Sequence, residues 1–259
     1  MTPKEGIVML SVTAHGPVVD IPLVLLHAFP LDSAMWAGML EAMPEVGVLT
    51  VDAPGFGGSA PVEGGLDAYA DAIAETLAYQ GIDRAVVAGL SMGGYTALAL
   101  AERHPRLLAG LGLLDTKATA DPEPARRKRL EMADAALVDG AAVVAPMIDV
   151  LLAPGAPEVT RAQVQDWLAQ APPSGIAWAQ RAMAERPDRL AVLGGLEVPS
   201  LVLRGAEDGI AIGDDHEQMA RALGTAVVEL HAAGHLSAVE EPAPVARALA
   251  DLANRATAS

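Results

Sequence analysis

The chain has 259 residues, of which 52% are hydrophobic, so it can bury one large core and needs no second one. Its 33 acidic residues outnumber its 17 basic residues, and the resulting net charge of -16 argues against nucleic-acid backbones and anionic membranes as partners. The sequence contains no cysteine, which excludes disulfides, thiolate metal sites and a cysteine nucleophile.

The amino-terminal residues and the hydropathy pattern bear on location. Residues 1–6 lack the basic and then apolar pattern of a secretory signal, and no stretch is long and apolar enough to span a bilayer. We therefore expect a cytoplasmic protein that has no membrane partner.

The first segments predict two strands. Apolar, β-branched runs at residues 7–13 and 18–26 flank a turn signal, His-Gly-Pro, at residues 15–17. This pattern predicts an N-terminal hairpin that leads into a buried strand.

A helix, a strand and a second helix come next. Asp32 or Ser33 is placed to cap a helix that continues to Met43, and residues 46–51 read as a further buried strand. Residues 67–81 carry apolar side chains at helical spacing and end in glycine, which predicts an amphipathic helix.

The stretch at residues 84–104 contains the most informative motif of the chain. Its apolar run at 85–88 predicts a buried strand, and the Ala- and Leu-rich sequence from Met92 onward predicts a helix. Between them, Gly89-Leu-Ser-Met-Gly93 has the G-x-S-x-G pattern of a nucleophile elbow, a sharp turn that projects the serine hydroxyl. Because a strand precedes the motif and a helix follows it, we predict that Ser91 is a nucleophile rather than an ordinary turn serine.

The remaining strands complete one sheet. Residues 108–114 form another apolar run, which ends at Asp115, and strand-like runs return at 200–204 and 226–230 before a last helix at about 243–253. Strands that alternate with helices predict an α/β protein that has a mostly parallel sheet with helices on both faces.

Between residues 116 and 195 the strand pattern disappears. Short helical stretches are separated by prolines, and a basic run at 126–129 stands beside acidic residues. Such a run is more often a solvated helix face than an anion site. We interpret residues 116–195 as an inserted helical cap, and residues 1–115 and 196–259 as the core domain.

A serine nucleophile needs a base, and on this kind of scaffold the order along the chain is Ser, then Asp or Glu, then His. His235 lies in a loop between the last strand and the last helix, from which it can reach the carboxyl edge of the sheet. His231 is expected to be packed, and His27 to be a structural hydrogen-bonding residue. Three further histidines are expected at the surface: His15, His104 and His216. His235 is therefore the predicted base.

Two aspartates compete to orient the base. Asp208 follows the strand at 200–204 by a tight turn, which places its carboxylate at the carboxyl edge of the sheet. Asp115 ends another strand, from which it could reach the histidine or cap the segment from Thr116 onward. Asp208 is preferred, and Asp115 remains the alternative.

Acyl transfer also requires two N–H groups aimed at the developing oxyanion. Met92, directly after the serine, can supply one from a helix N-terminus. Phe29 is the candidate for the other, because it follows a predicted strand and because Pro30 has no N–H.

Four motifs stand out along the chain: His27-Ala-Phe-Pro-Leu-Asp32 with Met35-Trp36, Asp52-Ala-Pro-Gly-Phe-Gly-Gly-Ser59, Gly89-Leu-Ser-Met-Gly-Gly94 and Ala233-Gly-His235. Together they resemble the α/β-hydrolase superfamily over nearly the whole chain. Within it, the sequence is most similar to carboxylesterases, enol-lactonases and cofactor-free haloperoxidases with small helical caps. Two departures are Ala28, where the family usually has Gly, and residues 208–213, which lack a common Pro.

The resemblance implies an α/β-hydrolase fold in which Ser91, Asp208 and His235 form a triad and Phe29 and Met92 donate to the oxyanion. It implies no metal and no cofactor. The function we infer from the sequence is a serine hydrolase that cleaves small carboxylic esters or lactones through an acyl-enzyme.

Two alternatives stay open. The first is a perhydrolase or haloperoxidase-like activity, in which hydrogen peroxide replaces water; Pro30 after Phe29 resembles that subgroup. The second is a non-catalytic ligand-binding protein on the same fold, although an apparently complete triad argues against a pure binder.

The composition of the cap bears on the substrate. Its large apolar side chains are expected to supply much of the wall over the site and to favour short and medium acyl chains. These residues are Trp167, Trp178, Met147 and Met183.

Overall fold

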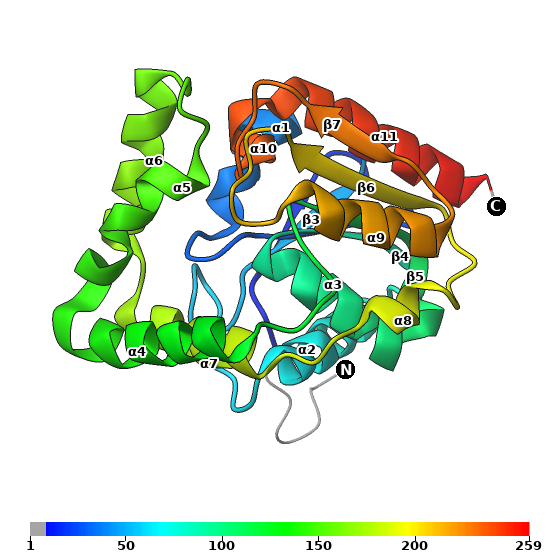
Figure 1. The fold of residues 1–259 in the computed structure, drawn as a ribbon. Coiled ribbons are helices and arrows are strands. Elements are labelled where there is room, and N and C mark those ends of the chain that lie inside the picture. Colours follow the sequence, from blue (N-terminus) through cyan, green and yellow to red (C-terminus); the bar gives the residue numbers. More distant parts are fainter. Residues whose placement is uncertain (1–8, 259) are drawn as a thin grey trace.

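The computed structural model describes residues 9–258, which fold around a seven-stranded sheet of order β1-β3-β2-β4-β5-β6-β7 (Figure 1). The strands are β1 (Val12–His15), β2 (Leu23–Leu26), β3 (Val48–Val51), β4 (Ala85–Leu90), β5 (Leu108–Leu114), β6 (Ser200–Gly205) and β7 (Val227–Leu230). Among these strands every neighbouring pair is parallel except β1 with β3. The predicted α/β class with a mostly parallel sheet is confirmed.

Helices cover both faces of this sheet (Figure 1). The α-helices are α1 (Ala37–Glu41), α2 (Leu66–Tyr79), α3 (Met92–Arg103), α4 (Glu123–Asp139), α5 (Ile148–Leu151), α6 (Glu158–Gln170), α7 (Pro173–Glu185), α8 (Leu190–Leu193), α9 (Gly213–Leu223), α10 (Ser237–Glu240) and α11 (Pro242–Thr257). The 3-10 helices are η1 (Ser33–Trp36), η2 (Pro105–Leu107) and η3 (Gly140–Met147). On one face α11 packs against β4, β5 and β6 beside α1; on the other, α3 packs against β2, β4 and β5 beside α2.

The central strands are buried along their whole length. Every residue of β2, β3, β4 and β5 is buried, which explains why their sequences are apolar runs instead of alternating patterns. Because these strands are parallel, their carboxyl ends lie at one edge of the sheet. Ser91 directly follows β4, Asp115 directly follows β5, and Asp208 comes three residues after β6.

The predicted N-terminal hairpin is wrong. β1 pairs with β3, with Val12 opposite Val51, while β2 lies between β3 and β4. Residues 16–20 are exposed and form no strand. An apolar run predicts a strand but not its partner, and both edges of β2 are already occupied by parallel neighbours. Ile7 and Val8 of the predicted first strand lie outside the described residues.

The predicted helix after β2 forms in two pieces, η1 and α1. The Asp32 carboxylate accepts a hydrogen bond from the Ala34 N–H at 2.9 Å, which confirms that Asp32 is a helix cap. Within residues 9–258 no helix is long and apolar enough to cross a membrane.

Between β5 and β6 the chain is helical, from α4 to α8. Helices α4 and α7 lie side by side below α5 and α6 (Figure 1). Two backbone approaches connect it to the core: a Cβ on Gly175 would lie 2.6 Å from the Gly55 carbonyl oxygen, and one on Gly234 would lie 2.4 Å from the Ala153 nitrogen. Glycine is therefore required at both approaches.

A buried ion cluster lies where the chain leaves the core. Both carboxylate oxygens of Asp121 accept hydrogen bonds from the Arg186 guanidinium at 2.7 Å, and Arg129 Nε donates to Asp121 at 2.5 Å. Lys117 Nζ is 3.2 Å away, and Arg186 stacks 4.1 Å from the centre of the Tyr95 ring on α3. Burial raises the pKa of Asp121, but the hydrogen bonds and charges of Arg186 and Arg129 outweigh it and lower that pKa. Arg129 thus departs from the solvated face predicted for its run.

We expect Asp121→Asn to destabilise the fold by about 3–5 kcal/mol, because it leaves the buried Arg186 charge without its counter-ion. Urea unfolding measures this loss. The matched control is Asp134→Asn, which removes an exposed partner of Arg181 at 2.7 Å and should cost at most about 1 kcal/mol. Since the pKa of Asp121 is lowered, the difference between Asp121→Asn and wild type should shrink as the pH falls below the ordinary pKa of an aspartate. Equal losses in the two variants would contradict the role of the cluster.

Candidate active site

The turn between β4 and α3 has the geometry of a nucleophile elbow. Ser91 has φ 54° and ψ -112°, a backbone conformation that residues other than glycine rarely adopt. A Cβ on Gly89 would lie 2.1 Å from the Gly93 backbone, and one on Gly93 would lie 2.0 Å from the Leu26 carbonyl oxygen. Both glycines are therefore needed for the turn to close against β2 and α3.

Two hydrogen bonds to the next strand hold the Ser91 backbone. Its N–H donates to the Leu114 carbonyl at 2.9 Å, and the Thr116 hydroxyl donates to the Ser91 carbonyl at 2.8 Å. Thr116 was not singled out from the sequence, because a threonine after a strand carries no distinguishing signal.

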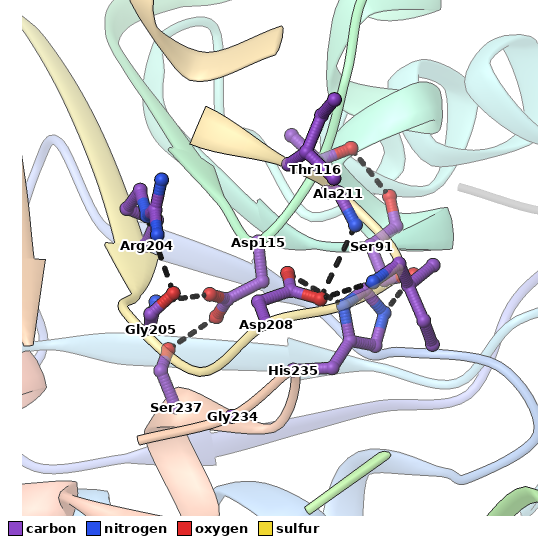
Figure 2. A network of polar contacts seen from close by, with 12 residues as sticks. Ser91, Asp115, Thr116, Arg204, Gly205, Asp208, Ala211, Gly234, His235 and Ser237 are labelled. Carbon is purple, nitrogen blue, oxygen red and sulfur yellow. Dashed lines mark hydrogen bonds and ion pairs between the residues drawn. The ribbon is translucent and has the colours of Figure 1, made fainter. Parts of the chain in front are cut away.

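The structure brings Ser91, His235 and Asp208 together (Figure 2). His235 Nε2 lies 2.8 Å from Ser91 Oγ, and His235 Nδ1 lies 2.9 Å from Asp208 Oδ2. All three residues are buried: the exposed fraction is 7% for Ser91, 2% for His235 and 6% for Asp208. With Nδ1 donating to the carboxylate, Nε2 is left to accept the serine proton.

The loop after β6 fixes the Asp208 carboxylate. Its Oδ1 accepts hydrogen bonds from the Ile210 N–H at 2.7 Å and the Ala211 N–H at 3.2 Å, which leaves Oδ2 for His235. The segment that departs from the family by lacking a Pro thus supplies the N–H groups that orient the acid.

Carboxylates around the imidazole control its pKa. Burial lowers the pKa of His235, but the hydrogen bond and charge of Asp208 outweigh it, and the charges of Asp115 and Glu240 add to them. The net result is a pKa raised above the usual histidine value.

Asp115, the alternative acid, bonds elsewhere. It is fully buried, accepts a hydrogen bond from the Gly205 N–H at 2.7 Å and another from the Ser237 hydroxyl, and so connects β6 to the chain after His235 (Figure 2). Its predicted alternative role as a cap for the segment from Thr116 is wrong, because the carboxylate is turned to these two donors instead. Burial raises its pKa to about 7, although the His235 charge opposes this.

The two N–H groups predicted to serve an oxyanion hole, those of Met92 and Phe29, lie in buried turns after β4 and β2. Met92 is the first residue of α3, so its N–H is among those that a helix leaves without an intrahelical partner. The Phe29 N–H donates to no other residue in the described part of the chain. Both residues are buried beside the ends of β2 and β4.

Two of the other histidines, His216 and His231, do not lie where the sequence predicted. His27 accepts from the Ala53 N–H at 2.8 Å and lies 3.0 Å from the Ala28 carbonyl, which confirms its structural role. His216 is buried and accepts from the Thr116 N–H, so its predicted surface position is wrong. His231 was expected to be packed, but 89% of its side chain is exposed, because the end of β7 is an open edge of the sheet.

The four cap residues occupy separate positions. Half-buried Trp167 lines a cavity of about 50 Å³ together with Pro30, Leu31 and Phe56. The Trp178 indole donates to the Gly64 carbonyl at 2.9 Å, so it holds α7 to the start of α2. Met183 is buried against Arg129, and Met147 is half-buried at the end of η3. Only Trp167 of the four is thereby placed beside the loop that carries Phe29, and a role of the others in substrate binding remains a prediction.

A hydroxyl beside an imidazole that is in turn beside a carboxylate is the arrangement that nucleophilic catalysis by serine requires. Within residues 9–258 no group of three or more His, Asp or Glu side chains is arranged to hold a metal ion. Glu240, which sequence reasoning missed, contacts the His235 loop through its carboxylate.

Part of the chain is similar in sequence to known esterases. One curated relative is a pimeloyl-[acyl-carrier protein] methyl ester esterase of Shewanella sp. (strain MR-7), 38% identical over 105 residues. That match covers 38% of this chain and 38% of the relative. Matches to two further esterases of the same description also cover well under half of each relative's length.

Solved structures resemble nearly the whole chain. A thermophilic esterase from Thermogutta terrifontis is 34% identical with a TM-score of 0.90, and the match covers 95% of this chain and 93% of the esterase. The enol-lactonase from Burkholderia xenovorans LB400 is 26% identical with a TM-score of 0.85, covering 94% of this chain and 95% of the lactonase. The family model described as "Alpha/beta hydrolase family" matches residues 23–248. The chain therefore belongs to the alpha/beta hydrolase family.

Proposed function

We propose that this protein is a serine hydrolase that cleaves small carboxylic esters or lactones through an acyl-enzyme. The observation that carries the proposal is the unbroken hydrogen-bond chain from Ser91 through His235 to Asp208. The esterases and the enol-lactonase to which the chain is similar support an ester or lactone as the substrate class.

Each proton in the proposed reaction passes through His235. Ser91 Oγ attacks the carbonyl carbon while its proton moves to His235 Nε2, and the imidazolium then gives that proton to the departing alkoxide. In a lactone this alkoxide remains attached to the acyl group. A water molecule next attacks the acyl carbon and gives a proton to Nε2, and that proton returns to Ser91 when the carboxylic acid leaves.

The backbone would stabilise the tetrahedral intermediates. The N–H groups of Met92 and Phe29 are proposed to donate to the oxyanion, and losing one such donor typically costs about 100- to 1000-fold in rate. Neither donation depends on a side chain, so Ala28 in place of the usual Gly removes no donor.

We further propose that residues 116–195 act as a cap over this centre and that residues 1–115 and 196–259 form the core. Contacts of residues 151–153 with the His235 loop and of Gly175 with Gly55 support this division. Short α8 packs against α3 and α9, so the boundary on that side lies within a segment held by the core.

We expect a fluorophosphonate to add once to the wild-type protein, at Ser91, because only a serine deprotonated by a neighbouring base attacks phosphorus readily. Intact-mass spectrometry measures the adduct. Ser91→Ala should lose both labelling and ester turnover, whereas the control Ser174→Ala, at an exposed position, should keep both. Labelling that survives in Ser91→Ala would sink the assignment.

The same assay separates the alternatives. A pure binding protein would give neither adduct nor turnover. A perhydrolase would label like a hydrolase but would form peracid from hydrogen peroxide faster than it hydrolyses the ester.

Asp208→Asn should lower kcat by on the order of 10⁴ without unfolding, since an amide favours the wrong imidazole tautomer. Asp115→Asn should keep most activity and lose about 1–3 kcal/mol of stability, because one of its two buried donors loses a good acceptor. Ester kinetics and urea unfolding of both variants make the comparison. Reversed results would assign the acid to Asp115.

A pH series adds a check on Asp115. Its pKa of about 7 is raised, so the folded protein keeps a proton that the unfolded chain releases above the ordinary aspartate pKa. The protonated Asp115 carboxyl therefore contributes its whole share of the free energy of unfolding at pH values below the ordinary aspartate pKa. That share is lost as the pH rises towards 7. Asp115→Asn should lack this loss.

Butanoyl esters should be cleaved with a higher kcat/KM than hexadecanoyl esters. Each methylene that fits an apolar pocket contributes about 0.8 kcal/mol, but only until the space beside the cap is full. Trp167→Ala should enlarge that space and move the optimum to longer chains, whereas the exposed control Val159→Ala should not. A hexadecanoyl preference in the wild type would rule out a small closed cap.

A further inference from the structure

The loop that carries His235 is connected to the cap on both sides of the histidine. The Leu236 N–H donates to the Leu151 carbonyl at 3.0 Å. On the other side, the Gly234 N–H donates to Glu240 Oε1 at 2.9 Å, and Glu240 Oε2 accepts from the Ala153 N–H at 2.7 Å. One carboxylate thus joins the residue before His235 to the cap.

The backbone around this connection is closely packed. A Cβ on Gly234 would lie 2.4 Å from the Ala153 nitrogen, and one on Gly205 would lie 2.1 Å from the Gly234 carbonyl oxygen. The His235 loop is therefore confined between the cap segment 151–153 and the end of β6, which precedes Asp208.

Helix α10 is held at both of its ends. The hydroxyl of Ser237, its first residue, donates a hydrogen bond to the Asp115 carboxylate. The carboxylate of Glu240, its last residue, accepts hydrogen bonds from the N–H groups of Gly234 and Ala153. Glu240 is the one of these anchors that involves the cap.

We propose that Glu240 is a positioning residue, which clamps the His235 loop to residues 151–153 of the cap and so couples the placement of the imidazole to the placement of the cap. This inference rests on the proposed function of His235 as the base. Glu240 touches neither the substrate nor the reacting atoms in this role, and it acts through the Gly234 and Ala153 amides.

The clamp needs both the charge and the length of a glutamate. Two convergent N–H donors are satisfied by the two oxygens of a carboxylate, whereas a glutamine offers one oxygen and turns an NH2 group to the other donor. An aspartate keeps the charge but is one methylene shorter and cannot span both amides.

The charge of Glu240 gives the clamp a signature in the titration of His235. The carboxylates that act on the imidazole are Asp208, Asp115 and Glu240, and each raises its pKa. Loss of the Glu240 charge lowers the pKa of His235, while loss of length alone does not remove that charge.

The test compares Glu240→Gln and Glu240→Asp with Glu241→Gln, a neighbouring half-buried glutamate whose carboxylate has no hydrogen bond or ion pair within residues 9–258. We expect both Glu240 variants to lower kcat on a butanoyl ester about 10- to 100-fold with little change in KM, as misplaced catalytic groups do. The rate of fluorophosphonate labelling at Ser91 should fall in parallel. Glu241→Gln should match wild type in both measurements.

Titration separates positioning from simple destabilisation. In Glu240→Gln the acid limb of the pH profile of kcat/KM, and the pKa of His235 measured by NMR, should move to lower pH; in Glu240→Asp both should stay near the wild-type values. If Glu240→Gln labels and titrates like Glu241→Gln, the inference is wrong while the proposed function stands. If both Glu240 variants unfold, Glu240 is a fold-stabilising residue and the inference is overturned.

Failure of the proposed function has a different result. It shows as absence of labelling in the wild-type protein. The NMR titration of His235 in the Glu240 variants then still reports whether the carboxylate acts on the imidazole.

Discussion

The backbone of Ser91 is the constraint on which the rest of the site depends. A non-glycine residue at φ 54° and ψ -112° costs on the order of 1–3 kcal/mol, and it persists only where the surroundings leave no alternative. Here β4 ends directly before it and α3 begins directly after it. Leu114, the last residue of β5, accepts a hydrogen bond from its N–H, and Thr116, two residues further on, donates one to its carbonyl. The buried strands of the sheet therefore hold the backbone of this turn in its unfavourable conformation.

Much of the fold was predictable because the central strands are buried on both faces. Continuous apolar runs mark β2, β3, β4 and β5 in the sequence, and the alternation with helices implies parallel pairing. Ser91 and Asp208 were also predictable, since each follows the end of a strand at the carboxyl edge of the sheet. His235 was predictable from its loop between the last strand and the last helix. The hydrogen bonds that join Ser91, His235 and Asp208 match that reasoning, while their catalytic roles remain predictions.

What the sequence did not reveal depends on partners that are distant along the chain. The pairing of β1 with β3, the burial of His216 and the exposure of His231 each follow from which element lies next in space, and no local pattern records that. Asp115 is similar: its place at a strand end was predictable, but the Gly205 and Ser237 donors that claim its carboxylate were not. Glu240 gave no signal because a glutamate on a short helix is ordinarily a solvated residue.

The close backbone contacts of the core glycines limit which amino-acid substitutions the sequence can accept. Gly89, Gly93 and Gly205 meet other segments through backbone atoms at about 2 Å from where a Cβ would stand, so any side chain there must displace main chain. A smaller side chain on the neighbouring residue cannot make room, because the atom in the way belongs to the main chain. Contacts such as Asp134 with Arg181 are different, since two exposed side chains can be exchanged together. The turns that carry Ser91 and Asp208 are therefore expected to accept almost no change at Gly89, Gly93 and Gly205, whereas exposed ion pairs can change as pairs.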